Sequence, residues 1–134
     1  MRRRASGPSV AAEPRHLPYP APIEAYGKGG FRFAGMSHRG SLLCLPDGIW
    51  PWPLSLASDI SEATLEPVFA RAGEIDLFLI GAGRGGWIVP RSLRERFKAL
   101  AISVEATNTG SAVSTYNILL GEGRRVAAGL IADE

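Results

Sequence analysis

A buried strand that runs into a glycine-rich loop constrains the fold of this chain more than any other segment. Residues 76–80 form a continuous apolar run entered by one acid, which is typical of a central strand covered on both faces. The glycine-rich loop at residues 81–86 follows, and residues 90–100 then place apolar side chains at helical spacing. Residues 102–106 have the pattern of a second strand. A strand, a helix and a strand within about thirty residues predict a right-handed βαβ unit with parallel strands.

Shorter strands precede this unit, and one more helix and strand follow it. Residues 23–52 have the pattern of strands interrupted by glycine-containing turns, and Pro51 predicts that its strand lies at a sheet edge because proline lacks a ladder donor. Residues 58–72 predict irregular helical turns, since a proline interrupts their apolar spacing. Residues 111–120 predict a helix and residues 126–131 a closing strand. Together these patterns predict an α/β fold with a small added β subdomain.

The chain is long enough for one domain with a buried core. It has 134 residues, and none of its apolar runs approaches the length of a membrane-spanning helix. Residues 1–22 contain five prolines and lack apolar periodicity, so we expect a disordered or loosely packed tail there. We expect residues 23–134 to form a single α/β domain.

The charge distribution argues against a nucleic-acid-binding domain. The net charge of +2 arises in residues 1–16, where four arginines stand against one glutamate, and the remaining chain has 11 basic and 12 acidic residues. The body therefore lacks the positive excess that neutralises several phosphates, and we expect no nucleic-acid partner. Cys44 is the only cysteine, which excludes an intramolecular disulfide and a multi-thiolate metal site. Its apolar neighbours predict a buried hydrophobe rather than a nucleophile.

The second half of the chain carries a recognisable combination of motifs. The apolar run into the glycine loop, the Thr-rich turn at residues 107–111 and the triplet Thr115-Tyr116-Asn117 resemble one family. It is the mitochondrial complex I assembly factor 3 family with its bacterial and archaeal relatives, a small domain of unknown function. The resemblance covers residues 23–131 and implies a three-layer arrangement around a mixed central sheet. It also implies a protein partner and an association with the biogenesis of respiratory complex I.

The glycine loop matches a dinucleotide-binding pattern, but its context does not fit that function. Gly81, Gly83 and Gly86 satisfy G-x-G-x-x-G directly after a strand. In that pattern the glycines lead straight into the helix whose N-terminus binds the pyrophosphate. Here residues 87–89 intervene before the helix begins, so we expect no bound dinucleotide and no other cofactor. The resemblance implies a Gly-Thr-Gly loop, in which Ala82 of this chain replaces the threonine.

Two loops nevertheless form a candidate ligand pocket. Both follow parallel strands and should emerge at the carboxyl edge of the sheet, where α/β folds bind ligands. N–H groups at the start of the second helix would favour an anion, with an arginine as counter-charge. The alternative is that Thr109 or Asn108 caps the helix and that the glycines only form turns. The candidate pocket residues are Gly81, Gly83, Arg84, Thr109 and Ser111.

The remaining polar motifs predict structural roles. Thr115, Tyr116 and Asn117 point in different directions on a helix, which excludes a catalytic triad. We expect Tyr116 to be a core aromatic whose hydroxyl finds a partner, and Asn117 to be a buried amide bonded to the glycine loop. His16 and His38 have no adjacent acid, and the sequence offers no metal-ligand spacing.

The patterns predict a non-enzymatic binding or assembly domain in the cytoplasm of a bacterium, with a mitochondrial location as the alternative. The alternative function is a small-molecule- or anion-binding protein, with or without catalysis, that uses the loops at residues 81–86 and 107–111. The oligomeric state and the identity of the partner stay open.

The three tryptophans allow the two functions to be told apart in a structure. A flat apolar patch around Trp50, Trp52 or Trp87 would favour a protein partner. A concave pocket that joins Arg84 to Thr109 would favour a ligand.

Overall fold

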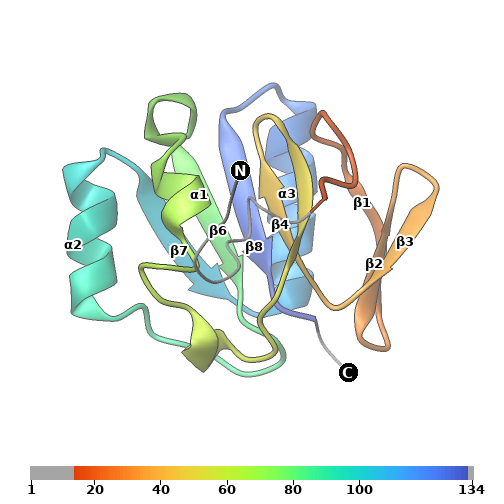
Figure 1. Ribbon diagram of the computed structural model, residues 1–134, viewed down its shortest axis with the longest axis horizontal. Coiled ribbons are helices and arrows are strands. Elements are labelled where there is room, and N and C mark those ends of the chain that lie inside the picture. The colour runs from red at the N-terminus through yellow and green to blue at the C-terminus, as the bar shows by residue number, and fades with distance from the viewer. Residues whose placement is uncertain (1–13, 133–134) are drawn as a thin grey trace, which may run out of the picture.

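The protein, described by a computed structural model for residues 14–132, combines a five-stranded mixed sheet with a three-stranded antiparallel sheet (Figure 1). The strands are β1 (Ile23–Gly27), β2 (Gly30–Phe33), β3 (Met36–Arg39), β4 (Ser41–Leu45), β5 (Gly48–Trp52), β6 (Leu77–Gly81), β7 (Ser103–Thr107) and β8 (Val126–Leu130). The α-helices are α1 (Glu66–Phe69), α2 (Arg91–Ala99) and α3 (Thr109–Gly121). Single 3₁₀ turns at Ala57–Asp59 and Ala72–Glu74 flank α1, which confirms the irregular helical segment.

The large sheet has the strand order β5-β4-β8-β6-β7. Strand β6 pairs in parallel with both β7 and β8, and β8 pairs antiparallel with β4. The predicted βαβ unit is therefore confirmed, with β6 as a central strand between two parallel neighbours. Strand β5 lies at an edge of the sheet, as the proline at its fourth position predicted.

Apolar side chains cover both faces of the large sheet, which produces the predicted three layers. On one face Phe78 of β6 stacks on Phe97 of α2 with ring centroids 5.6 Å apart, and Phe69 of α1 meets Phe97 edge-on. On the other face Leu79 belongs to a cluster with Tyr116 of α3 and the apolar side chains of the small sheet. Because neighbouring strand residues point to opposite faces, Phe78 and Leu79 serve different layers.

The tryptophans of β5 are core residues rather than surface residues. Trp50 and Trp52 share one face of the strand as predicted, but their side chains are only 5% and 1% exposed. The indole N–H of Trp52 donates to the Thr64 carbonyl at 3.1 Å, since the segment before α1 covers this face. Trp87 is half-buried and packs on the same cluster. The apolar surface patch considered for these three residues is therefore absent.

Helix α3 begins two residues earlier than the apolar spacing predicted. Asn108 is its N-cap, and the Asn108 side chain accepts a hydrogen bond from the Ser111 N–H at 2.8 Å. This cap satisfies one of the N–H groups that lack a partner within the helix. Thr109 thereby becomes the first helical residue instead of part of the preceding loop.

Asn117 joins α3 to the small sheet rather than to the glycine loop. Its Oδ1 accepts from the Ile23 N–H at 2.8 Å, and its Nδ2 donates to the Ile23 carbonyl at 2.9 Å. The side-chain amide thus occupies the place of a neighbouring strand along the edge of β1. The expected bond between Asn117 and the glycine loop was wrong, because the residue faces β1 across 94 positions of sequence.

Tyr116, the neighbouring residue, is a core aromatic as expected, and the group that its hydroxyl approaches is the Cys44 thiol, outside hydrogen-bond geometry. The ring is 1% exposed, and the hydroxyl has no hydrogen-bond partner among residues 14–132. Burial and the neighbouring Cys44 thiol raise the pKa of Tyr116.

Residues 14–22, which the sequence assigned to a loosely packed tail, lie against the domain, while residues 1–13 of that tail are outside the described part. Leu17 is buried and exchanges backbone hydrogen bonds with Ile49 of β5. His16 Nε2 lies 3.0 Å from His38 Nδ1, and His38 Nε2 lies 3.1 Å from the Ser41 carbonyl oxygen. Because a carbonyl only accepts, neutral His38 donates from Nε2 and accepts at Nδ1 from His16.

We predict that Asn117→Ala lowers the free energy of unfolding by about 1–3 kcal/mol, because it leaves the Ile23 N–H and carbonyl unpaired. Ser114→Ala, at an exposed position of the same helix, should change it by no more than about 0.5 kcal/mol. Chemical denaturation measures both values. Equal stability of the two variants would show that the amide does not hold the small sheet.

We also predict a loss of stability between pH 7 and pH 5 that depends on the two histidines. Burial lowers the pKa of His16 and of His38 from the usual 6.5. The unfolded chain therefore binds protons first as the pH falls, and folding stability decreases below about pH 6.5. Denaturation at several pH values measures this slope, which should flatten in the His16→Gln/His38→Gln variant. An unchanged slope would rule out the pair as its source.

Candidate functional site

The carboxyl ends of β6, β7 and β8 meet at one edge of the large sheet. Strand β7 follows β6 on one side, and β8 lies on the other side after α3, so the chain changes direction across the sheet here. The Ala82 N–H donates to the Thr107 carbonyl at 2.7 Å, and the Ile131 N–H donates to the Gly81 carbonyl at 2.8 Å. Such a switch point is where open α/β sheets place their ligand crevice.

The Thr109 side chain fills this switch point. Its hydroxyl donates to the Ile131 carbonyl at 2.8 Å and accepts from the Gly83 N–H at 2.9 Å. The Thr109 N–H in turn donates to the Gly83 carbonyl at 2.9 Å. Thr109 is fully buried, so a side chain of the protein uses the donors and acceptors that a crevice would offer to a ligand.

Gly81 allows α3 to pack closely on the sheet. A Cβ at this position would lie 3.0 Å from Thr109 Cα and 3.2 Å from Ala112 Cβ. The first glycine of the loop therefore allows a closer contact between the helix and the strand than a residue with a side chain would. The same contact places Thr109 within reach of the loop backbone.

An open hollow of about 730 Å³ lies beside this closed point, and we call it the glycine-loop hollow. Its lining residues come from three segments that converge at the carboxyl edge: Ser55, Leu56 and Ala57; Ala82, Gly83, Arg84 and Gly85; and Ile131 and Ala132. Most of its walls are backbone and small side chains. Figure 1 shows the three segments at the lower edge of the molecule.

The structure brings two of the five predicted pocket residues together in this hollow. Gly83 and Arg84 line it, whereas Gly81 and Thr109 are buried outside its lining. Ser111 is exposed on α3, and its N–H is bonded to Asn108. The pocket that would join Arg84 to Thr109 is therefore not formed, and a ligand role for these residues stays a prediction.

Sequence patterns did not point to the segment at residues 55–57 as part of this surface. Leu56 contributes an apolar side chain that is 61% exposed at the hollow. Ile88, at the far end of the glycine loop, is 83% exposed. The two apolar residues Leu56 and Ala57 between Ser55 and Ser58 were the only signal in the sequence, and such a pair is too short to show periodicity.

Outside the glycine-loop hollow, Cys44 and His38 are side chains that could act as a nucleophile or a base, and both have structural roles. Burial raises the pKa of the Cys44 thiol to about 12, so the thiolate is scarce near neutral pH. His38 is held between His16 and the Ser41 carbonyl. Among residues 14–132, histidine, cysteine and acidic side chains form no group of three that could hold a metal ion. Within the same residues, every helix is too short or too polar to cross a membrane.

Residues 23–131 match the model of a family described as proteins of unknown function (DUF498/DUF598). An uncharacterised protein of Rhodobacter capsulatus is 40% identical over 110 residues, which cover 82% of this chain and 83% of that protein. The NADH dehydrogenase [ubiquinone] 1 alpha subcomplex assembly factor 3 of Danio rerio is 31% identical over 109 residues. That match covers 81% of this chain but only 63% of the assembly factor's length.

A solved structure has the same fold. The NMR structure of a Rhodopseudomonas palustris protein is 50% identical to this chain and superposes with a TM-score of 0.79. The match covers 90% of this chain and 89% of that one. The mixed α/β architecture with its added small sheet is therefore common to both proteins.

We predict that Thr109→Val destabilises the protein by about 1–3 kcal/mol, because the Gly83 N–H and the Ile131 carbonyl lose their buried partner. Thr109→Ser keeps the hydroxyl and serves as the control, with a smaller loss from its missing methyl group. Urea denaturation measures both variants. A valine variant as stable as the serine variant would mean that the hydroxyl does not tie the two segments together.

Proposed function

The chain belongs to the DUF498/DUF598 family of proteins of unknown function, and from this membership we propose that it is a non-enzymatic binding domain for the assembly of a respiratory complex. The partner in this proposal is a protein subunit or assembly intermediate of NADH dehydrogenase. The assembly-factor name of a relative within the family supports the proposal. The chain spans less than two thirds of that relative, so the role concerns the part that both proteins share.

The observation that carries the proposal is the glycine-loop hollow with its exposed apolar rim. Backbone atoms and small side chains line a volume of about 730 Å³, into which a partner can insert a side chain. Leu56 stands exposed at the rim, where a partner can bury it. Protein interfaces place the side chains that dominate binding in desolvated pockets near their centre, and the hollow offers such a pocket to a partner. The closed switch point favours this use over small-molecule catalysis, because Thr109 already occupies the crevice.

A second candidate is the binding of a small anion at the loops of residues 81–86 and 107–111. Arg84 lines the hollow and would supply a positive charge. The Gly83 and Ser111 N–H groups are bonded within the protein, so such an anion would have to rely on other donors. This candidate therefore stands behind the protein partner.

We place this function in the bacterial cytoplasm, where a domain of this size can reach subunits before they join a membrane complex. The Arg-rich, Lys-poor composition and the bacterial relatives support this location. A mitochondrial location is the alternative, supported by the animal assembly factors.

A deletion strain of the native host tests the proposal. We predict less assembled NADH dehydrogenase on native gels and slower NADH oxidation by membranes, with both restored by the wild-type gene. Leu56→Asp should not restore them, because a charge at the rim opposes burial and should weaken partner binding by about tenfold or more. Its own folding stability should stay within about 0.5 kcal/mol of the wild type, since Leu56 is exposed.

Ile118→Asp is the matched control, because Ile118 is equally exposed on α3, outside the lining of the hollow. It should restore the enzyme fully. Normal NADH dehydrogenase levels in the deletion strain would contradict the assembly role. Full rescue by Leu56→Asp would contradict the binding surface.

A further inference from the structure

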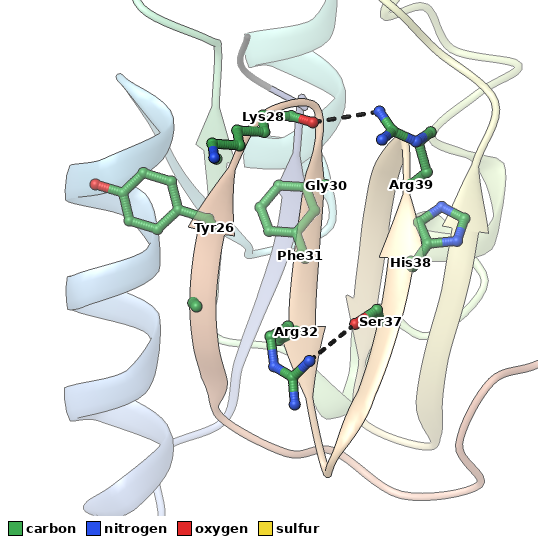
Figure 2. Close-up of a pocket in the computed structure, with 10 residues that line it drawn as sticks. Tyr26, Lys28, Gly30, Phe31, Arg32, Ser37, His38 and Arg39 are labelled. Carbon is green, nitrogen blue, oxygen red and sulfur yellow. Dashed lines mark hydrogen bonds between the residues drawn. The ribbon is translucent and has the colours of Figure 1, made fainter.

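A second hollow lies on the small sheet and shares no residue with the glycine-loop hollow (Figure 2). It has a volume of about 400 Å³ and is lined by residues of β1, β2 and β3, and we call it the hairpin hollow. This volume lies within the range of small-molecule sites. The proposed assembly function does not use this surface.

Positive charge dominates the lining of the hairpin hollow. Lys28 lies at the turn between β1 and β2, Arg32 lies on β2, and Arg39 ends β3. None of the ten lining residues is acidic. In Figure 2, Lys28 and Arg39 lie at the end of the hairpin where β1 turns into β2, and Arg32 lies beside Ser37 toward the other end. The Tyr26 ring extends from β1 toward the helix.

Among the described residues, no carboxylate forms an ion pair with Lys28, Arg32 or Arg39. The ion pairs within residues 14–132 involve other arginines, among them Arg71 with Asp47 and Arg96 with Glu62. Arg32 Nη1 instead donates to the Ser37 hydroxyl at 3.3 Å, and Arg39 Nη1 donates to the Lys28 carbonyl at 3.3 Å. These neutral acceptors orient the guanidinium groups and keep their charge available to an anion.

The centre of the hollow is kept open by small residues. The strand register places Gly27 opposite Gly30, and Ala25 opposite Arg32. A Cβ at Gly30 would meet the His38 carbonyl oxygen at 2.6 Å, so this position accepts only glycine. A Cβ at Gly27 would meet no atom within 4 Å, which shows the free space above the strand.

We propose that the hairpin hollow binds the phosphate group of a small, soluble phosphate ester. A phosphate monoester carries a charge of about −1.5 to −2 near neutral pH and three acceptor oxygens. Lys28 and Arg39, at the turn end of the hairpin, offer an ammonium and a guanidinium group to the phosphate. Arg32 lies beside Ser37, further along β2, and offers its charge to the rest of the ester. The Tyr26 ring and the Ser37 hydroxyl supply contacts for the rest of the ester.

Titration of the ¹⁵N-labelled protein with inorganic phosphate, glycerol 3-phosphate and acetate tests the proposal. We expect saturable shifts of amide signals in residues 25–39 with glycerol 3-phosphate, smaller shifts with inorganic phosphate, and the weakest response with acetate. Binding should weaken as salt increases, because exposed charges carry it. An absence of saturable shifts in residues 25–39 would overturn the proposal.

A charge-matched pair of variants assigns the binding to the hollow. The triple variant Lys28→Gln/Arg32→Gln/Arg39→Gln should bind glycerol 3-phosphate about tenfold more weakly or worse. The control Arg91→Gln/Lys98→Gln/Arg124→Gln removes three exposed charges outside the lining and should bind like the wild type. If both variants lost the same affinity for glycerol 3-phosphate, net charge alone would explain the binding, and the proposed site would be wrong.

Vesicles distinguish a soluble ester from a lipid head group. Co-sedimentation with phosphatidylglycerol vesicles should leave the protein in the supernatant, in agreement with a soluble ligand. Binding to the vesicles without binding of glycerol 3-phosphate would overturn the proposal and assign the hollow to a membrane surface.

Discussion

The buried hydroxyl of Thr109 is the interaction on which the carboxyl edge of the sheet depends. It connects the loop after β6 to the chain after β8, and it does so from the first residue of α3. Most buried hydroxyls are hydrogen-bonded, and both partners of the Thr109 hydroxyl are backbone groups that would otherwise be orphaned. The glycine at the end of β6 favours the same contact, because a Cβ there would lie only 3.0 Å from Thr109 Cα.

The closed edge distinguishes this protein from α/β folds that bind a ligand at the switch point. Nucleotide-binding α/β folds leave the switch point open for a ligand, whereas this chain fills it with a side chain. The two proposed binding surfaces, the glycine-loop hollow and the hairpin hollow, both lie outside this closed point. Helix α3 supports both, because Thr109 holds the glycine loop and Asn117 holds β1. Loss of the Thr109 hydroxyl should therefore affect the glycine loop, and loss of the Asn117 amide should affect β1.

Local periodicity was sufficient to predict β6, α2, β7 and the edge position of β5, because neighbouring residues determine these features. Contacts between distant segments were not accessible in this way. The partner of Asn117 lies 94 positions away in the sequence. Trp52 is buried under the segment before α1, where its indole N–H donates to the Thr64 carbonyl. Leu17 packs on β5 although the prolines around it suggested a loose tail. Of the residues that line the glycine-loop hollow, the sequence analysis named Gly83 and Arg84 but not Leu56, whose exposure only the fold reveals.

Native-state hydrogen exchange of the Gly83 amide tests the central claim most directly. A glycine amide in an exposed loop exchanges quickly, whereas one bonded to a buried hydroxyl exchanges only when the structure opens. The account predicts that the Gly83 N–H is protected nearly as strongly as the amides of β6, while that of exposed Gly85 exchanges quickly. Rapid exchange at Gly83 equal to that at Gly85 would show an open switch point and would contradict the account.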